Sequence, residues 1–209
     1  MTLYGYWRSS SSWRVRIALH FKGLEFDNVP VHLVRDGGEQ LQAAHLQRNP
    51  MGQVPVLEVD GVYLGQSMAI LEYLEEQHPQ PALLPEMPLQ RAQARRIAEV
   101  INSSVQPLQN LSLVKRLHAE FGADKVDWMR SVIQDGMDRL ESSVAGGVGP
   151  FLVGDGPSFA EVCLIPQLFN ARRWGCNVSA WPTLLRAEMA AQEHPAFLAA
   201  HPDRQPDAQ

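Results

Sequence analysis

The N-terminal part of the chain alternates between short apolar stretches and stretches with helical spacing. "TLYGYW" is typical of a buried strand, and Trp13, Ile17 and Phe21 recur at the spacing of one helix face. "FDNVPVHLV" predicts a second strand, so the start of the chain forms a β–α–β unit with parallel strands. A short helix over 40–47, a hairpin in "VPVLEVDGVYLGQS" and a helix in "SMAILEYLEEQHP" follow. This order predicts a small α/β domain of the thioredoxin type over residues 1–80.

The remainder of the chain has helical periodicity and no convincing strand. "PQPALLPEMP" is rich in proline, which is typical of a connection, and we assign residues 81–88 to a linker. Two long helical stretches follow over residues 89–121 and 128–144, and the capping-box pattern S-F-A-E opens a further helix, "SFAEVCLIPQLFNARRW". Short helices complete the chain, and we expect the tail "RQPDAQ" to be loose. The second domain is therefore predicted to be all-α over residues 89–209.

Composition narrows the range of partners. The hydrophobic content of 45% and charged content of 20% are ordinary for a globular protein, and the net charge of -5 argues against nucleic acid. No apolar run is long enough for a signal-peptide core or a membrane span, so we expect no membrane partner and a cytoplasmic location. The two cysteines, Cys163 and Cys176, and the seven scattered histidines lack metal-ligand spacing, so no metal site is expected.

The first predicted helix begins at four consecutive serines, Ser9 to Ser12. No acidic residue occurs from Met1 to Leu24, and the charged residues there are Arg8, Arg14, Arg16 and Lys22. A helix start presents unpaired N–H groups and a positive dipole, which favour an anion, and serine hydroxyls add donors. A thioredoxin would carry C-x-x-C here, so dithiol exchange is excluded. The plain alternative is that one serine caps the helix and the others form a turn.

Two further features of the same domain point to ligand binding. Val54 and Pro55 stand at the start of an apolar strand, where a cis bond would turn the backbone groups of Val54 outward to pair with a peptide. Gln66 and Ser67 open another helix, which could hold a carboxylate as the first helix holds its anion. Each feature also has a purely structural explanation, and their occurrence together in one small domain favours a site.

With these residues in view, the chain resembles the zeta-class glutathione transferases, which include maleylacetoacetate isomerase. The class signature is S-S-C-x-W-R-V-R-I-A-L, and this chain has "SSSSWRVRIAL". Further similar stretches are "NPMGQVPVL", "QSMAILEYLEE", "QPLQNLS", "EVCLIPQ" and "HPDRQPD". The resemblance implies a thioredoxin-like domain that binds glutathione, an all-helical domain that faces the substrate, and a homodimer.

The resemblance also implies which residues contact glutathione. Those around the thiol and cysteinyl part are Ser9, Ser10, Ser11, Ser12, Trp13 and Arg14. Val54 would pair with the peptide, and Gln66 and Ser67 would hold the γ-glutamyl end. Further positions that match contacts of the class are Gln40, Gln106, Asn110, Leu111 and Ser112. Ser11 replaces the cysteine of the class motif, which puts in doubt only reactions that need a protein thiol there.

The implied reaction is a cis–trans isomerisation of a maleyl dicarboxylate by addition of the glutathione thiolate, bond rotation and elimination. We expect Ser9 to be the main thiolate donor, with Ser10 and Ser11 as competitors. Arg8 and Arg173 are expected to bind the substrate carboxylates, because arginine forks suit carboxylates. Arg14 and Arg16 have a structural alternative, in which they form ion pairs with acidic residues of the other domain or subunit.

Several functional alternatives remain open at this point. Maleylacetoacetate from tyrosine breakdown and maleylpyruvate from gentisate breakdown are both candidate substrates. Relatives that favour maleylpyruvate tend to have arginines where this chain has Gln109 and Asn110, which favours maleylacetoacetate. The same pocket could support conjugation or dehalogenation of small α-halo acids. A non-catalytic binding module of the same fold is the third possibility.

Overall fold

The computed structural model describes residues 1–208 and divides them into two compact units. The first unit combines Met1–Leu83 with the C-terminal segment that begins at Glu193, and the second is Leu84–Gln192. The sequence placed that C-terminal segment with the helical domain. The structure groups it with the sheet instead, because its helix α9 (Pro195–Ala199) packs against α1 (Ser10–Phe21).

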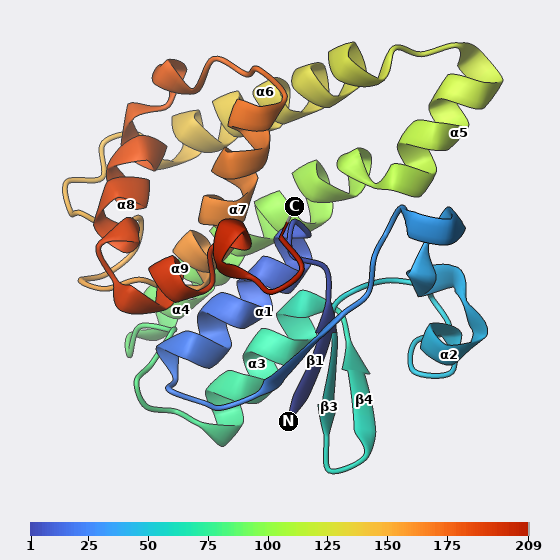
Figure 1. Cartoon of the computed structure of the whole chain (residues 1–209). Coiled ribbons are helices and arrows are strands. Elements are labelled where there is room, and N and C mark those ends of the chain that lie inside the picture. Colours follow the sequence, from blue (N-terminus) through green and yellow to red (C-terminus); the bar gives the residue numbers. More distant parts are fainter. Residues whose placement is uncertain (209) are drawn as a thin grey trace. The chain divides into compact units, whose positions relative to one another are not determined.

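The first unit contains a four-stranded mixed sheet with the order β2-β1-β3-β4. Figure 1 labels β1, β3 and β4 of this sheet. Its strands are β1 (Thr2–Gly5), β2 (Asp27–Pro30), β3 (Val56–Val59) and β4 (Val62–Gly65). β1 pairs parallel with β2 and antiparallel with β3, and β3 pairs antiparallel with β4. The thioredoxin-like arrangement predicted from the sequence is therefore confirmed, and β1 and β4 run in the same direction.

The helices of this unit are α1, the short α2 (Ala43–Leu46), α3 (Ser67–Gln77) and α9. α1 and α3 pack against each other, and the core beneath them includes the fully buried Leu3, Ile17, Leu57 and Ile70. The helix expected over 40–47 is broken into a 3-10 turn, Glu39–Leu41, followed by α2.

The second unit contains only helices and turns among the described residues. Its α-helices are α4 (Pro88–Glu99), α5 (Leu111–Phe121), α6 (Lys125–Val144), α7 (Phe159–Arg173) and α8 (Pro182–Gln192). A π-helical turn, Val100–Val105, and 3-10 turns at Gln106–Gln109 and Val178–Ala180 interrupt them. The predicted capping box at Ser158 and Glu161 is present at the start of α7.

The tail after α9 is ordered, so the expectation that it is loose is wrong for the described residues. A 3-10 turn, Pro202–Arg204, follows α9. Beyond it, an Asp207 carboxylate oxygen accepts a hydrogen bond from the backbone N–H of Trp7 at 3.1 Å. The tail is therefore held by polar contacts with the beginning of the chain, which local sequence patterns do not reveal.

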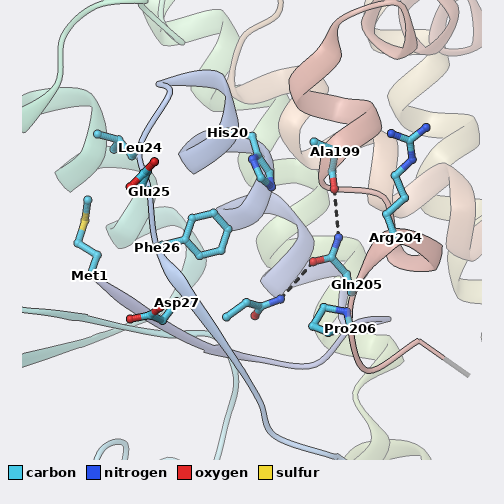
Figure 2. A pocket seen from close by; sticks show the side chains of 11 residues that line it. Met1, His20, Leu24, Glu25, Phe26, Asp27, Ala199, Arg204, Gln205 and Pro206 are labelled. Carbon is cyan, nitrogen blue, oxygen red and sulfur yellow. Dashed lines mark hydrogen bonds between the residues drawn. The ribbon is translucent and has the colours of Figure 1, made fainter.

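A pocket of about 700 Å³ lies in the first unit between this tail and the C-terminal end of α1 (Figure 2). Met1, His20, Phe26, Arg204 and Gln205 are among its lining residues. Met1 precedes β1, so the pocket lies at the sheet edge where β1 and β2 begin. The serine cluster follows the other end of β1 and lies outside this pocket.

Within residues 1–208, none of the helices is long and apolar enough to cross a membrane. No cluster of three or more histidine, cysteine or acidic side chains in that range could hold a metal ion.

Candidate functional site

The topology of the sheet brings three of the predicted ligand-binding stretches to one edge. β1 and β4 end at this edge, and the antiparallel β3 begins there. Ser9 to Ser11 follow β1, Val54 and Pro55 directly precede β3, and Gln66 and Ser67 follow β4. Segments far apart in the sequence therefore meet where two helices of the same unit begin, an arrangement that favours ligand binding in α/β folds.

Ser9 is the N-cap of α1, so the capping alternative raised from the sequence is confirmed for this serine. Its Oγ accepts a hydrogen bond from the backbone N–H of Ser12 at 3.2 Å. A hydroxyl that accepts a bond keeps its own proton to donate, so capping and thiolate binding are compatible. The first turn of α1 contains no acidic residue, and the N–H groups of Ser10 and Ser11 have no partner within the helix. This helix start can therefore stabilise an anion.

Ser12, Trp13 and Arg14 are buried and make contacts that support this helix start. Ser12 is fully buried, and its Oγ accepts from the Tyr6 N–H at 3.3 Å. The Trp13 side chain is 2% exposed and packs edge-to-face with the His201 ring. Arg14 is also buried and donates to Ser67 Oγ at 3.2 Å. These side chains therefore support the loop, and direct contact of these residues with glutathione stays a prediction.

The second helix start at this edge has an unusual backbone. Gln66 has a φ of 68°, a conformation that favours glycine and that is often retained at functional sites. Its amide donates to Gln53 Oε1 at 3.2 Å. Ser67 begins α3, and because its Oγ accepts from Arg14, its proton is available to a carboxylate. The contact between Arg14 and Ser67 also ties α1 to the first residue of α3.

Val54 and Gln40 are the remaining predicted contacts of the first unit. The Val54–Pro55 peptide bond is cis, as the sequence analysis anticipated. Val54 precedes the first paired residue of β3, so its backbone lies beyond the ladder of the sheet. Gln40 lies on the 3-10 turn before α2, and its Oε1 is buried without a hydrogen-bond partner.

The two other arginines of the first helical segment have different surroundings. Arg8 is half-buried, with its Cζ 4.9 Å from the centre of the Trp7 ring. Arg16 is 1% exposed and donates to the carbonyls of Tyr6, Trp7 and Ala200. Burial lowers the pKa of Arg16 to about 10. Arg14 donates to a serine hydroxyl and Arg16 to carbonyls of its own unit. The negative charge of Asp207, in the C-terminal segment that the sequence placed in the other domain, also acts on Arg16 and raises its pKa against the effect of burial.

In the second unit, the predicted contacts gather at the start of α5. Asn110 is the N-cap of this helix, and its Oδ1 accepts from Gln106 Nε2 at 3.1 Å. Leu111 and Ser112 form the first turn of α5. The start of α5 is therefore polar, and the hydrogen bond between Gln106 and Asn110 orients both side chains there.

Gln109 belongs to a buried amide network that sequence reasoning missed. Its Nε2 donates to Gln167 Oε1 at 3.0 Å, and its Oε1 accepts from Asn170 at 2.6 Å. Gln109 is only 6% exposed, so it holds the 3-10 turn before α5 against α7. These hydrogen bonds fix the orientation of the Gln109 side chain.

The adjacent arginines at the end of α7 have separate roles. Arg172 forms a bidentate ion pair with the buried carboxylate of Glu188 on α8, and this hydrogen bonding raises the pKa of Arg172. Arg173 is exposed, with its Cζ 5.0 Å from the centre of the Trp174 ring. Glu188 thus engages Arg172, and the role of Arg173 as a carboxylate ligand stays a prediction.

The residues at the sheet edge fit the chemistry of glutathione. Its thiolate is an anion that suits the hydroxyl and N–H groups at the start of α1. Its γ-glutamyl carboxylate suits the second helix start at Ser67, and its peptide suits the unpaired backbone of Val54. The order of the strands brings all three to the same edge, and no ion or protein thiol is required for the fit.

Comparisons with known proteins agree with this assignment. Residues 1–76 match the family model of the glutathione S-transferase N-terminal domain. The maleylacetoacetate isomerase of Rattus norvegicus is 46% identical, over 98% of this chain and 94% of that protein. A bacterial maleylpyruvate isomerase, described as a zeta-class glutathione transferase, superposes with a TM-score of 0.95 at 36% identity and complete coverage of both chains.

A second solved structure adds information on ligands. The maleylacetoacetate isomerase of Anaeromyxobacter dehalogenans 2CP-1 was solved with dicarboxyethyl glutathione and citrate in its active site. It superposes with a TM-score of 0.89 at 48% identity, over 100% of this chain and 97% of that one. On the combined evidence of motifs, fold and relatives, this chain belongs to the zeta class of the glutathione transferase family.

Proposed function

We propose that this protein is a glutathione-dependent cis–trans isomerase that converts maleylacetoacetate to fumarylacetoacetate, or maleylpyruvate to fumarylpyruvate, in the catabolism of tyrosine or other aromatic compounds. The observation that carries the proposal is the start of α1, where Ser9 caps the helix and retains a hydroxyl proton to donate. Bound glutathione supplies a thiolate that adds to the cis double bond and leaves after rotation. The relatives named above support the choice of substrates.

The stabilisation of the glutathione thiolate that Ser9 and the start of α1 must provide is moderate. A thiol with a pKa near 8.5 is only about 3% ionised at pH 7. Lowering that pKa to about 6.5 raises the ionised fraction about 25-fold and requires about 2.7 kcal/mol of stabilisation. One hydrogen bond to a charged group contributes about 1.5–3 kcal/mol, and the helix dipole about 0.3–1 kcal/mol more. The Ser9 hydroxyl and the N–H groups of Ser10 and Ser11 can therefore supply the required stabilisation of about 2.7 kcal/mol.

Other residues of the chain hold glutathione in place. Ser67 and Gln66 take the γ-glutamyl end at the start of α3, while the backbone of Val54 pairs with the peptide. Gln40 and the start of α5, with Gln106, Asn110, Leu111 and Ser112, are proposed as further contacts. Ser12, Trp13 and Arg14 act by holding the two helix starts in position.

Arg8 and Arg173 are proposed to bind the carboxylates of the substrate and to offset the negative charge that develops during the reaction. Arg8 directly precedes the serine cap, and Arg173 is an exposed residue at the end of α7. The relative from Anaeromyxobacter binds a glutathione derivative whose dicarboxyethyl group adds two carboxylates, groups that suit arginine ligands.

Arg173→Ala is expected to raise KM for the isomerase substrate about tenfold or more, because a charge-assisted carboxylate contact contributes about 1.5–3 kcal/mol. The Kd for glutathione should stay unchanged. The matched control is Arg172→Ala, which removes the ion pair with Glu188 and should lower stability without raising KM in the same way. A loss of glutathione binding in Arg173→Ala would show that this arginine belongs to the glutathione site instead.

The substrate assay that tests the proposal generates maleylacetoacetate and maleylpyruvate in situ with their ring-cleaving dioxygenases. The purified protein is then added with and without glutathione, and the chromophore of each substrate is followed. Conversion to the fumaryl isomer only with glutathione is the expected result, and the faster substrate identifies the pathway. Turnover of an α-halo acid with no isomerisation would favour conjugation or dehalogenation. Glutathione binding without any turnover would favour a binding module.

The proposal also includes a homodimer in the cytoplasm. Sedimentation of the purified protein tests the dimer, with twice the mass of the chain as the expected result.

A further inference from the structure

We propose that the C-terminal segment from Ala200 to Asp207 is a positioning element for the catalytic loop, and that it holds Ser9 in place through Arg16 and Trp7. The inference deepens the proposed function and rests on it, because the loop matters through the thiolate that Ser9 would bind. The loop in question is Tyr6 to Ser9, which connects β1 to α1.

Arg16 links this loop to the tail inside the protein. Its Nη2 donates to the Trp7 carbonyl at 2.7 Å and its Nη1 to the Tyr6 carbonyl at 3.4 Å. Its Nε donates to the carbonyl of Ala200, directly after α9, at 3.2 Å. A single buried guanidinium therefore donates hydrogen bonds both to the loop before Ser9 and to the residue that begins the tail.

Asp207 makes the second connection, at the far end of the tail. Its carboxylate accepts from the N–H of Trp7 at 3.1 Å. The same carboxylate opposes the effect of burial on Arg16, because its negative charge raises the pKa of that guanidinium. Trp7 is thus held at its N–H by Asp207 and at its carbonyl by Arg16, and Ser9 follows two positions later.

The tail has contacts of its own that make it firm enough for this role. Gln205 is buried, and its amide donates to the carbonyl of Ala199 (Figure 2). The same amide donates to the carbonyl of His201 and accepts from Asn28 Nδ2 on β2. The ring of His201 packs edge-to-face on Trp13. Between its two connections to the loop, the tail is therefore fixed to β2 and to α1.

The loop transmits this placement directly to the catalytic serine. The N–H of Ser9 donates to the Tyr6 carbonyl at 3.0 Å, which is one of the two loop carbonyls that also accept from Arg16. Ser12, one turn into α1, receives the Tyr6 N–H on its hydroxyl. A small displacement of Tyr6 or Trp7 therefore moves Ser9 relative to the thiolate, and small misplacements of reacting groups reduce rates strongly.

The test compares Asp207→Ala, Asp207→Asn and the control Asp203→Ala in the full-length protein. Asp203 is an exposed carboxylate in the same tail, with its side chain beside His201. Three quantities are measured for each variant: the pKa of the bound glutathione thiol by thiolate absorbance, the Kd for glutathione, and kcat for isomerisation. Thermal unfolding verifies that each variant is folded at the assay temperature.

Asp207→Ala is expected to raise the pKa of the bound thiol by about half a unit and to lower kcat about tenfold, while the Kd for glutathione changes less than threefold. Asp207→Asn retains an oxygen acceptor for Trp7 and should recover part of both effects. Asp203→Ala should match the wild type. If Asp207→Ala leaves the thiol pKa and kcat unchanged, or if Asp203→Ala changes them equally, the tail does not position the loop.

Failure of this inference can be distinguished from failure of the proposed function. The thiol pKa of bound glutathione needs no maleyl substrate, so the variants can be compared on that quantity even if the wild type isomerises nothing. If the wild-type protein lowers the thiol pKa but isomerises neither substrate, the proposed isomerase function is contradicted. The thiol pKa values of the Asp207 and Asp203 variants would then still decide whether the tail positions the loop.

Discussion

Ser9→Ala is expected to lower kcat for isomerisation by about 10- to 100-fold and to raise the pKa of the bound glutathione thiol toward its free value. The substitution removes a hydroxyl donor to a charged group, which contributes about 1.5–3 kcal/mol. Stopped-flow or steady-state kinetics with saturating glutathione measures the first quantity, and a pH titration of the thiolate absorbance measures the second.

Matched variants separate this role from helix capping. Ser9 also accepts from the N–H of Ser12, so its loss should reduce stability by about 1 kcal/mol. Ser9→Asp restores the cap but not the donor at neutral pH, and it should remain as inactive as Ser9→Ala. Ser10→Ala and Ser11→Ala keep the backbone N–H groups, and their kcat for isomerisation should fall less than threefold. If kcat falls further in either of those variants than in Ser9→Ala, that serine and not Ser9 is the main donor to the thiolate.

Arg16→Met is expected to lower the free energy of unfolding by about 3 kcal/mol, the largest effect on stability that we predict from a single side chain. The substitution leaves the carbonyls of Tyr6, Trp7 and Ala200 without their donor in the protein interior. Each buried acceptor that loses its partner costs about 1–3 kcal/mol, partly offset because the buried charge is also removed. Denaturant unfolding monitored by tryptophan fluorescence measures the change.

Two further variants make this result interpretable. Arg16→Lys keeps the charge and can satisfy some of the carbonyls, so it should lie between Arg16→Met and the wild type. Arg35→Ala removes an exposed arginine, 56% exposed in its side chain, and should change stability by less than about 0.5 kcal/mol. Wild-type stability in Arg16→Met would mean that the carbonyls reach other donors and that Arg16 is not the link described here.

The sequence predicted well those features that depend on neighbouring residues. The order of strands and helices along the first unit, the helix starts at Gln66 and Ser67, and the capping box of α7 all follow from local spacing, and the structure contains them. α1 begins at Ser10 with Ser9 as its N-cap, within the serine cluster where the sequence analysis expected the helix start.

Features that depend on distant residues could not be predicted in this way. The contacts of Arg16 with Ala200 and of Trp7 with Asp207 join the two ends of the chain, and nothing in either local pattern indicates the partner. The network around Gln109 likewise depends on how α7 packs. Local patterns gave the helix starts of the site, while the side chains that hold them were visible only in the folded chain.

The central claim is that the start of α1 ionises the thiol of glutathione, and one titration tests it most directly. The ultraviolet absorbance of the thiolate is recorded from pH 5 to 10 for glutathione bound to the wild-type protein, with the free protein as the blank. The account predicts a midpoint near about 6.5, about two units below a free thiol. A midpoint that stays near about 8.5 with glutathione fully bound would contradict it.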